Sequence, residues 1–446
     1  MVSPSSKGSH RSILGIIFLT VFIDIVGFSV IFPLFPRMLE HYLVLEGPKS
    51  SIGGLVRFLQ RVAGEEPGPG AAVPFSVVVL FGGVLGSLYS VLQFLFSPVW
   101  GGLSDRIGRR PALLFTLGGT VLGYVLWVFA GRFWLLLAAR LLGGIMAGNI
   151  STASAAVADV TSDKDRAKGM GIVGMAIGLG FVLGPALGGL FSKYQLAAAG
   201  DSPGAFSLNP FSMPALVALA LAFLNLVWAA ARFPETWSRD GRSDRVEART
   251  LNPLARLRTL DYPGLKRTNV IYLVFLTAFS AMEFTLTFLA SERFAFEPRD
   301  NAMMFVFVGL VMAFVQGGLV RRLAPRLGEK NLSLQGLVLV IPGFVLVALA
   351  HRTQILYFGL FFMAVGSAMA SPSLGALASR YTPADRQGLS MGVFRSMGSL
   401  SRAIGPIIGG VLYWQLGSSA PYWAGAVALL LPIALGTTLP PVPRSD

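Results

Sequence analysis

Charged residues are scarce in this sequence. Asp, Glu, Lys and Arg make up 13% of the 446 residues, about half the share of roughly 25% found in soluble globular domains. So little charge leaves too few polar side chains to cover a surface that faces water. Hydrophobic residues reach 54% and the mean hydropathy is +0.66. The composition therefore predicts a multi-pass membrane protein.

Cysteine is absent, and histidine occurs only as His10, His41 and His351. The absence excludes disulfides, thiolate chemistry and cysteine–zinc sites. The scattered histidines do not predict a metal site. We recognise neither a Gly-Lys-Ser or Gly-Lys-Thr phosphate-binding loop nor a nucleophile–base–acid group. We therefore expect no enzyme activity, no built-in ATPase and no metal or cofactor.

Twelve apolar runs are long enough to cross the hydrocarbon core, which needs about 20 residues of helix. They are too long and too continuous to be barrel strands, so we expect an all-α protein. The runs cover residues 13–36, 76–98, 111–131, 133–158, 168–191, 212–233, 269–291, 300–320, 333–351, 354–379, 387–414 and 420–439.

The net charge of +14 would suggest a nucleic-acid partner if the protein were soluble. Here the basic residues fall mainly in loops between apolar runs. With a cytoplasmic N-terminus, 24 of the 36 Lys and Arg residues lie on the cytoplasmic face and 9 on the other. The positive-inside rule therefore predicts that both termini are cytoplasmic, and we expect no nucleic-acid partner.

Two polar segments interrupt the pattern of apolar runs. A basic cytoplasmic linker, residues 236–268, separates a six-span half over residues 1–235 from a second over residues 269–446. An extracytoplasmic insertion, about residues 40–74, contains apolar residues at helical spacing. It is interpreted as a short amphipathic helix on the membrane surface, with a ligand lid as the alternative.

One glycine–proline pattern occurs in both halves at a constant offset of 221 residues. Small residues four apart on one helix face allow two helix backbones to approach closely. A doubled pattern is typical of transporters built from two related halves, with the substrate site near the midplane between them. The first copy is Gly171, Gly180, Gly184, Pro185, Gly188 and Gly189, and the second is Gly392, Ser401, Gly405, Pro406, Gly409 and Gly410.

Several segments resemble the major facilitator superfamily. Residues 101–110 (GGLSDRIGRR) are similar to its signature loop, and residues 140–144 (RLLGG) to a motif of drug–proton antiporters. The glycine–proline pattern matches the antiporter motif, and residues 234–236 (PET) are common in that group. The resemblance implies 12 transmembrane helices in two pseudo-symmetric six-helix halves.

A closer resemblance is to the animal tetracycline transporter-like group. It is carried by residues 89–95 (YSVLQFL), 283–289 (EFTLTFL), 143–145 (GGI) and 148–151 (GNIS). This resemblance implies efflux of organic anions in exchange for protons. The counterpart of the signature loop in the second half of the chain departs from the family pattern. Arg321 and Arg322 follow Gly318 there, with no acid in the place that Asp105 has in the first half.

Two acids lie within the predicted spans, where charge is costly and usually functional. Asp24 is central in the first span and Glu283 in the seventh. A carboxyl group in a low-dielectric cavity can take up and release a proton near neutral pH. We predict that both acids couple protons or pair with substrate, with Ser280 and Thr287 on the same face as Glu283. The alternative is that each acid only bonds a neighbouring helix.

Three arginines also lie inside predicted spans. Arg140 resembles the motif arginine that assists proton transfer in drug antiporters. Arg395 and Arg402, seven residues apart, share one face of the eleventh span. They suit an anionic substrate or pair with the acids. Three further polar residues could line the cavity or bond between helices; they are Gln93, Asn149 and Gln316.

The signature loop is predicted to be a cytoplasmic latch of ion pairs that favours the outward-facing state. The alternative is positive-inside topology alone, which leaves Asp105 unexplained. The latch residues are Gly102, Asp105, Arg106, Gly108, Arg109, Arg110 and Asp159, with Asp165 and Arg166 as further candidates.

These features predict proton-coupled antiport of an amphipathic organic solute, an anion in preference to a cation, by alternating access. The alternatives are a uniporter or proton symporter of a metabolite, and a non-transporting membrane receptor or scaffold. A single chain suffices, so we expect a monomer in the bilayer. Plasma membrane, nuclear envelope and endolysosomal membranes all fit.

Overall fold

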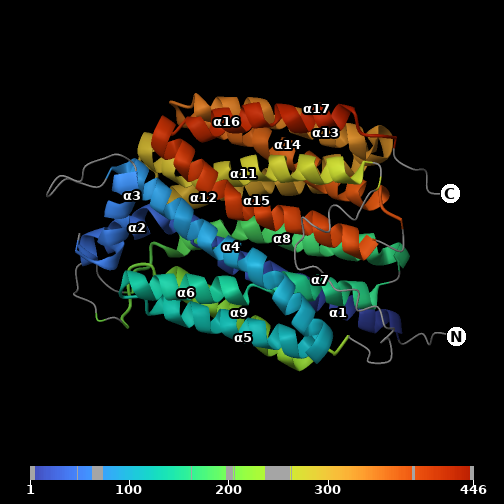
Figure 1. The fold of residues 1–446 in the computed structure, drawn as a ribbon, viewed down its shortest axis with the longest axis horizontal. Coiled ribbons are helices and arrows are strands. Elements are labelled where there is room, and N and C mark those ends of the chain that lie inside the picture. The colour runs from blue at the N-terminus through green and yellow to red at the C-terminus, as the bar shows by residue number, and fades with distance from the viewer. Residues whose placement is uncertain are drawn as a thin grey trace.

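The computed structural model describes residues 6–47, 49–62, 74–161, 163–196, 204, 206–236, 262, 264–383 and 387–441. Within these ranges the chain is helical apart from loops and one isolated bridge between Ala130 and Phe206. Most helices run along the long axis, and both termini lie at one end, called here the terminus end (Figure 1). The predicted linker falls largely on residues 237–261, outside the described ranges.

The first half holds six crossings and a short insertion at the opposite end, called here the far end. A helical break at Ala147 and Gly148 divides the fourth crossing in two. The elements are α1 (Ser6–Ser29), η1 (Phe32–Leu34), α2 (Phe35–Glu46), α3 (Ser51–Val62), α4 (Phe75–Ile107), α5 (Arg109–Val128), α6 (Phe133–Met146), α7 (Asn149–Val160), α8 (Asp163–Phe191) and α9 (Ser212–Arg232).

The second half also crosses six times, with a π-helical segment extending the eighth crossing and a break at Leu429 within the twelfth. Its elements are α11 (Leu265–Phe294), α12 (Pro298–Phe314), η3 (Val315–Val320), α13 (Arg321–Ala348), α14 (Thr353–Arg380), α15 (Gln387–Leu416), α16 (Ala420–Ala428) and α17 (Leu430–Thr437).

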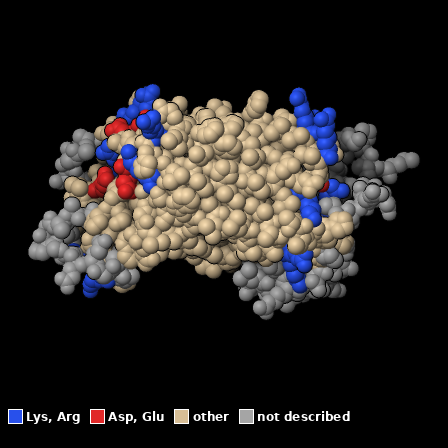
Figure 2. Space-filling model, turned by 90° about the horizontal axis from the view of Figure 1, so that it is seen from above, with Lys and Arg blue, Asp and Glu red and all other residues tan. Residues whose placement is uncertain are grey.

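Ten described helices are long and apolar enough to cross a membrane. One of them, Pro298–Ala348, has 51 residues, or roughly 75 Å of helix, and therefore accounts for two crossings of a core about 30 Å thick. The backbone breaks within it at Gly328, where φ is +76°. The 30-residue α15 supplies the twelfth, so the predicted twelve-helix all-α fold is confirmed. Figure 2 shows a belt without charge between two charged ends.

The repeated glycines bring helices together within each half. A Cβ atom at Gly184 would lie 2.7 Å from the backbone oxygen of Val26 on α1, and one at Gly188 would lie 2.0 Å from that of Val30. In the second half, a Cβ at Gly409 would lie 2.8 Å from the Ala281 oxygen on α11. The doubled pattern therefore makes the same backbone contact twice, between α8 and α1 and between α15 and α11.

The two halves meet where α4 crosses α15 and α8 crosses α12. Contact is again through backbone: a Cβ at Gly83 would lie 2.7 Å from the Pro406 oxygen, and one at Gly189 would lie 2.3 Å from the Pro298 oxygen. An exposed ion pair of 3.3 Å between Arg37 and Glu297 also joins the halves. These contacts close the far end of the molecule.

Candidate functional site

A cavity of about 650 Å³ lies between the halves and reaches the terminus end at Arg380. The first half contributes α7 and α8, while α11, α12, η3, α14 and α15 of the second half form the rest. Most of the wall is apolar and rich in methionine and phenylalanine. These wall residues include Met175, Phe181, Met282, Phe279, Phe305, Met312, Met363, Met391 and Phe394.

Four charged side chains line this cavity: Glu283, Arg380, Arg395 and Arg402. Arg380 at the mouth forms a 2.6 Å ion pair with Glu329, so its charge is neutralised locally. Arg395 and Arg402 lie deeper, on the face of α15 that the sequence predicted. The inner cavity therefore carries two guanidinium groups and one carboxyl group.

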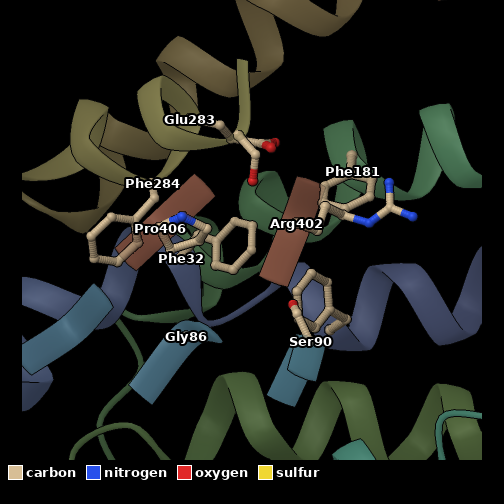
Figure 3. A pocket seen from close by; sticks show the side chains of 10 residues that line it. Phe32, Gly86, Ser90, Phe181, Glu283, Phe284, Arg402 and Pro406 are labelled. Carbon is tan, nitrogen blue, oxygen red and sulfur yellow. The ribbon is translucent and has the colours of Figure 1, made fainter. Parts of the chain in front are cut away.

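Glu283 and Arg402 stand where the cavity narrows into a small pocket that both also line. Figure 3 shows the Glu283 carboxyl pointing into this pocket and the Arg402 side chain beside Phe181. The Arg402 guanidinium lies 5.5 Å from the Phe181 ring centroid. It is within electrostatic range of Glu283, but no salt bridge joins the two described side chains. Each group is therefore available to a third charge.

Phenylalanine rings from both halves close the far side of the narrow pocket. Phe28 packs edge-on against Phe32 at 5.2 Å between ring centroids. Phe35 of the first half meets Phe284 of the second at 6.2 Å, and Phe284 meets Phe288 at 5.2 Å. Sequence reasoning assigned no aromatic residue to the site. These rings are three or four residues apart in the sequence, in the segment from α1 to α2 and again in α11, and this spacing could have indicated them.

Asp24 lies outside the cavity wall, inside the first half. It is 4% exposed and accepts a 3.1 Å hydrogen bond from Asn149 Nδ2, while Thr116 donates to Asn149 Oδ1. Its hydrogen-bond partner Asn149 lies on α7, and Asp24 is not among the residues that line the cavity. Of the two acids predicted to couple protons or pair with substrate, only Glu283 lines this cavity.

Arg140 is buried and stacks on aromatic rings, 4.6 Å from the Tyr89 centroid and 5.8 Å from that of Phe28. The Asp24 carboxyl is also within electrostatic range of Tyr89. Among the described residues, nothing hydrogen-bonds to the Arg140 Nε and Nη2 atoms or to Asp24 Oδ2. A buried guanidinium and a buried carboxyl therefore lie in one half without a direct ion pair.

The other predicted polar residues divide between the cavity and helix packing. Ser280 and Gln316 line the cavity. Gln93 donates a 3.4 Å bond to the Ala147 oxygen at the break between α6 and α7, and buried Thr287 bonds to the Phe284 oxygen. Gln93, Asn149 and Thr287 therefore act in helix packing in this conformation.

The Major Facilitator Superfamily model matches residues 17–351 and 322–446. The chain belongs to this superfamily. It is 34% identical to major facilitator superfamily domain-containing protein 10 of Bos taurus, over 98% of this chain and 95% of that protein. It is 31% identical to the class C tetracycline resistance protein of Escherichia coli, over 77% and 82% of the two chains.

The crystal structure of the human organic anion transporter MFSD10 (TETRAN) has a fold similar to that of this chain. Its TM-score is 0.75 at 33% identity, covering 96% of this chain and 99% of that one. The comparisons confirm the predicted family and its antiporter-type relatives. The protein is a multi-pass membrane transporter and not an enzyme.

The signature loop of this major facilitator protein forms a cluster of ion pairs around Arg109. Its guanidinium bonds Asp105 at 2.6 Å and Asp159 at 2.9 Å, and Ser104 at 2.7 Å. These contacts tie α4, α5 and α7 together within the first half. The cavity reaches the terminus end although the cluster is formed, because none of these bonds crosses to the second half.

Glu235 caps the start of α5, a role that sequence reasoning missed. Its carboxylate accepts from the backbone N–H groups of Arg109 at 2.8 Å and Arg110 at 3.2 Å, where the helix N-terminus favours negative charge. Gly108 permits the approach, with φ of +105°. Arg106 is exposed and forms no hydrogen bond or ion pair with the described residues. Gly102 has open space around its Cβ position, so no close contact there requires a glycine.

The second half contains the same loop with its charges exchanged. Gly328, at φ +76°, stands where Gly108 stands in the first half, at an offset of 220 residues. One residue later, Glu329 takes the place of Arg109 and pairs with Arg380, which stands 221 residues after Asp159. The motif that is degraded in sequence therefore persists as an ion pair of inverted polarity.

We expect Arg109→Gln to lower the free energy of unfolding by about 2 kcal/mol. The change removes the guanidinium that bonds two partly buried carboxylates, and the full cost of a broken buried pair, about 3–5 kcal/mol, is reduced by their partial exposure. Thermal unfolding of the detergent-solubilised protein measures the effect. Arg106→Gln, an exposed neighbour in the same loop, should change it little, and equal losses in both variants would contradict the role of the cluster.

Proposed function

We propose that this transporter exports an amphipathic organic anion in exchange for protons, by alternating access. The observation that carries the proposal is the pairing of Arg395 and Arg402 with a largely apolar cavity wall. Guanidinium groups bind carboxylates in bidentate fashion, and the apolar wall suits the rest of an amphipathic molecule. The relative described as an organic anion transporter adds support.

Two carboxyl groups are candidates to carry the proton. Glu283 lies in the cavity, so its charge responds directly to whatever binds Arg402. Asp24 lies apart from the cavity, within electrostatic range of the Tyr89 ring on which Arg140 stacks, so it would respond through helix movement. Exchange requires that proton and anion bind in alternate conformations, which favours a contribution from Asp24.

Cotransport of a proton with the anion is a second candidate, and the proximity of Glu283 to Arg402 favours it. When Glu283 is ionised it competes with the substrate anion for Arg402. Protonation of Glu283 removes that competitor, so proton and anion then favour each other's binding. This linkage opposes strict exchange unless a conformational change separates the two binding events.

A pH gradient of either sign across proteoliposomes tests the coupling. We expect uptake of a labelled organic anion to be driven by an acidic lumen under exchange, and by an acidic exterior under cotransport. Under cotransport Glu283→Gln should remove most of the dependence on the gradient, and under exchange Asp24→Asn should remove most of it. Exposed Glu40→Gln is the matched control. Uptake that ignores both gradients in all variants would leave a facilitator and contradict proton coupling.

The remaining features of the proposal follow from topology. The terminus end is proposed to be cytoplasmic, so the cavity faces the cytoplasm in this conformation and is ready to load an exported solute. One chain encloses the whole cavity wall, which supports action as a monomer. Domain limits at residues 1–235 and 269–446 are proposed on the division of the helices into two sets.

A further inference from the structure

A basic helix end projects from the eighth crossing at the terminus end. The helix continues from α12 through η3 to Leu327 before the break at Gly328. Arg321, Arg322 and Arg326 are exposed on this last stretch. At 100° per residue they fall within a 140° arc. The opposite arc packs on the protein through Val320, Leu323, Ala324 and Leu327.

These three arginines form no hydrogen bond or ion pair with the described part of the chain. The neighbouring acid, Glu329, is already paired with Arg380. In the first half, by contrast, Arg109 is neutralised by two aspartates. The second half therefore presents a cluster of uncompensated positive charge at the edge of the apolar belt, at the basic terminus end (Figure 2).

An exposed apolar track runs along the helix up to this cluster. Leu310 is 67% exposed and Phe314 is 82% exposed, and Leu319 follows at 42%. Between them, Gly317 and Gly318 have no heavy atom within 4 Å of their Cβ positions. The helix therefore offers a shallow notch in its lipid-facing surface, directly beside the arginines.

We propose that an anionic phospholipid binds here, with its phosphate at Arg321, Arg322 and Arg326 and an acyl chain along Phe314 and the Gly317–Gly318 notch. Guanidinium groups recognise phosphate, and basic residues at a membrane surface attract anionic lipids. The apolar track selects a lipid over a free phosphate. Gln316, the neighbour of Gly317 in the sequence, lines the cavity, so the bound lipid would lie on a helix that also forms the cavity wall.

The test uses the full chain reconstituted in phosphatidylcholine vesicles that contain trace spin-labelled phosphatidylserine. We expect the wild type to immobilise more labelled phosphatidylserine than labelled phosphatidylcholine. Replacing Arg321, Arg322 and Arg326 together by Gln should remove the preference, at about fivefold in affinity per arginine. The matched control replaces Arg132, Arg299 and Arg352 by Gln. It removes an equal charge at the far end and should preserve the preference for phosphatidylserine.

A second variant tests the apolar part of the site. Gly317→Leu fills the notch without a clash, so it should fold normally and still weaken binding of the labelled lipid. Inorganic phosphate at millimolar concentration should not displace the lipid; displacement would overturn the acyl-chain contact. A phosphatidylserine preference that survives the triple arginine variant, or that the far-end control abolishes equally, would overturn the site.

Discussion

Replacing Arg402 by Gln should lower the apparent affinity for a labelled organic anion about 100-fold. The substitution removes a charge-assisted contact from a desolvated site, where truncating one partner costs 2–5 kcal/mol. It also leaves Glu283 in the cavity without an opposing cation close by, so an entering anion meets a like charge. Concentration-dependent uptake into proteoliposomes measures the effect.

The double variant Arg402→Gln/Glu283→Gln distinguishes binding from a folding defect. Removing the repelling carboxyl should restore part of the lost affinity, because the two residues share one narrow pocket. Exposed Arg352→Gln on the far-end loop should bind as the wild type does. An Arg402→Gln protein with unchanged affinity would show that the anion lies elsewhere in the cavity.

Gly188→Ala is expected to destabilise the protein by about 3 kcal/mol, through overpacking of two helices. The new Cβ would lie 2.0 Å from the Val30 backbone oxygen and 3.2 Å from Pro33 Cγ. Neither group is the free end of a flexible side chain, so α8 and α1 must separate. Thermal unfolding in detergent measures the change.

Gly178→Ala is the matched control on the same helix. Its Cβ meets no heavy atom within 4 Å, and alanine is the better helix former by about 1 kcal/mol. The two substitutions should therefore shift the melting temperature in opposite directions. Equal shifts would mean that glycine in α8 serves the flexibility of the helix and not its close contact with α1.

The fold could be predicted because lipid imposes a simple rule on sequence. Long apolar runs must be helices, and their number and order follow directly. Helix ends and breaks were harder to place: the span predicted over residues 133–158 is interrupted at Gly148, and the helix predicted over residues 300–320 continues to Leu327. Both features depend on packing between helices, which hydropathy does not record.

The charged cavity residues could be anticipated because burial of charge is rare enough to be noticed. Glu283, Arg395 and Arg402 line one cavity because the faces of α11 and α15 that carry them point into it. Asp24 met the same criterion and lies elsewhere, because periodicity cannot tell which neighbour a buried face meets. The ion pair between Glu329 and Arg380 was not predicted. The two halves were compared for the same residues at the same positions, and here the acid and the base have exchanged positions.

The far end, where the two halves meet, is closed mainly by apolar contacts, so its opening will depend on temperature. The far end is sealed by phenylalanine rings and backbone contacts, and the ion pair between Arg37 and Glu297, which is exposed, contributes little. Opening it hydrates apolar surface, so the step has a positive heat capacity and its enthalpy rises with temperature. Warming and cooling therefore change the balance between the state open at the terminus end and the state open at the far end, even when the lipid composition of the membrane stays constant.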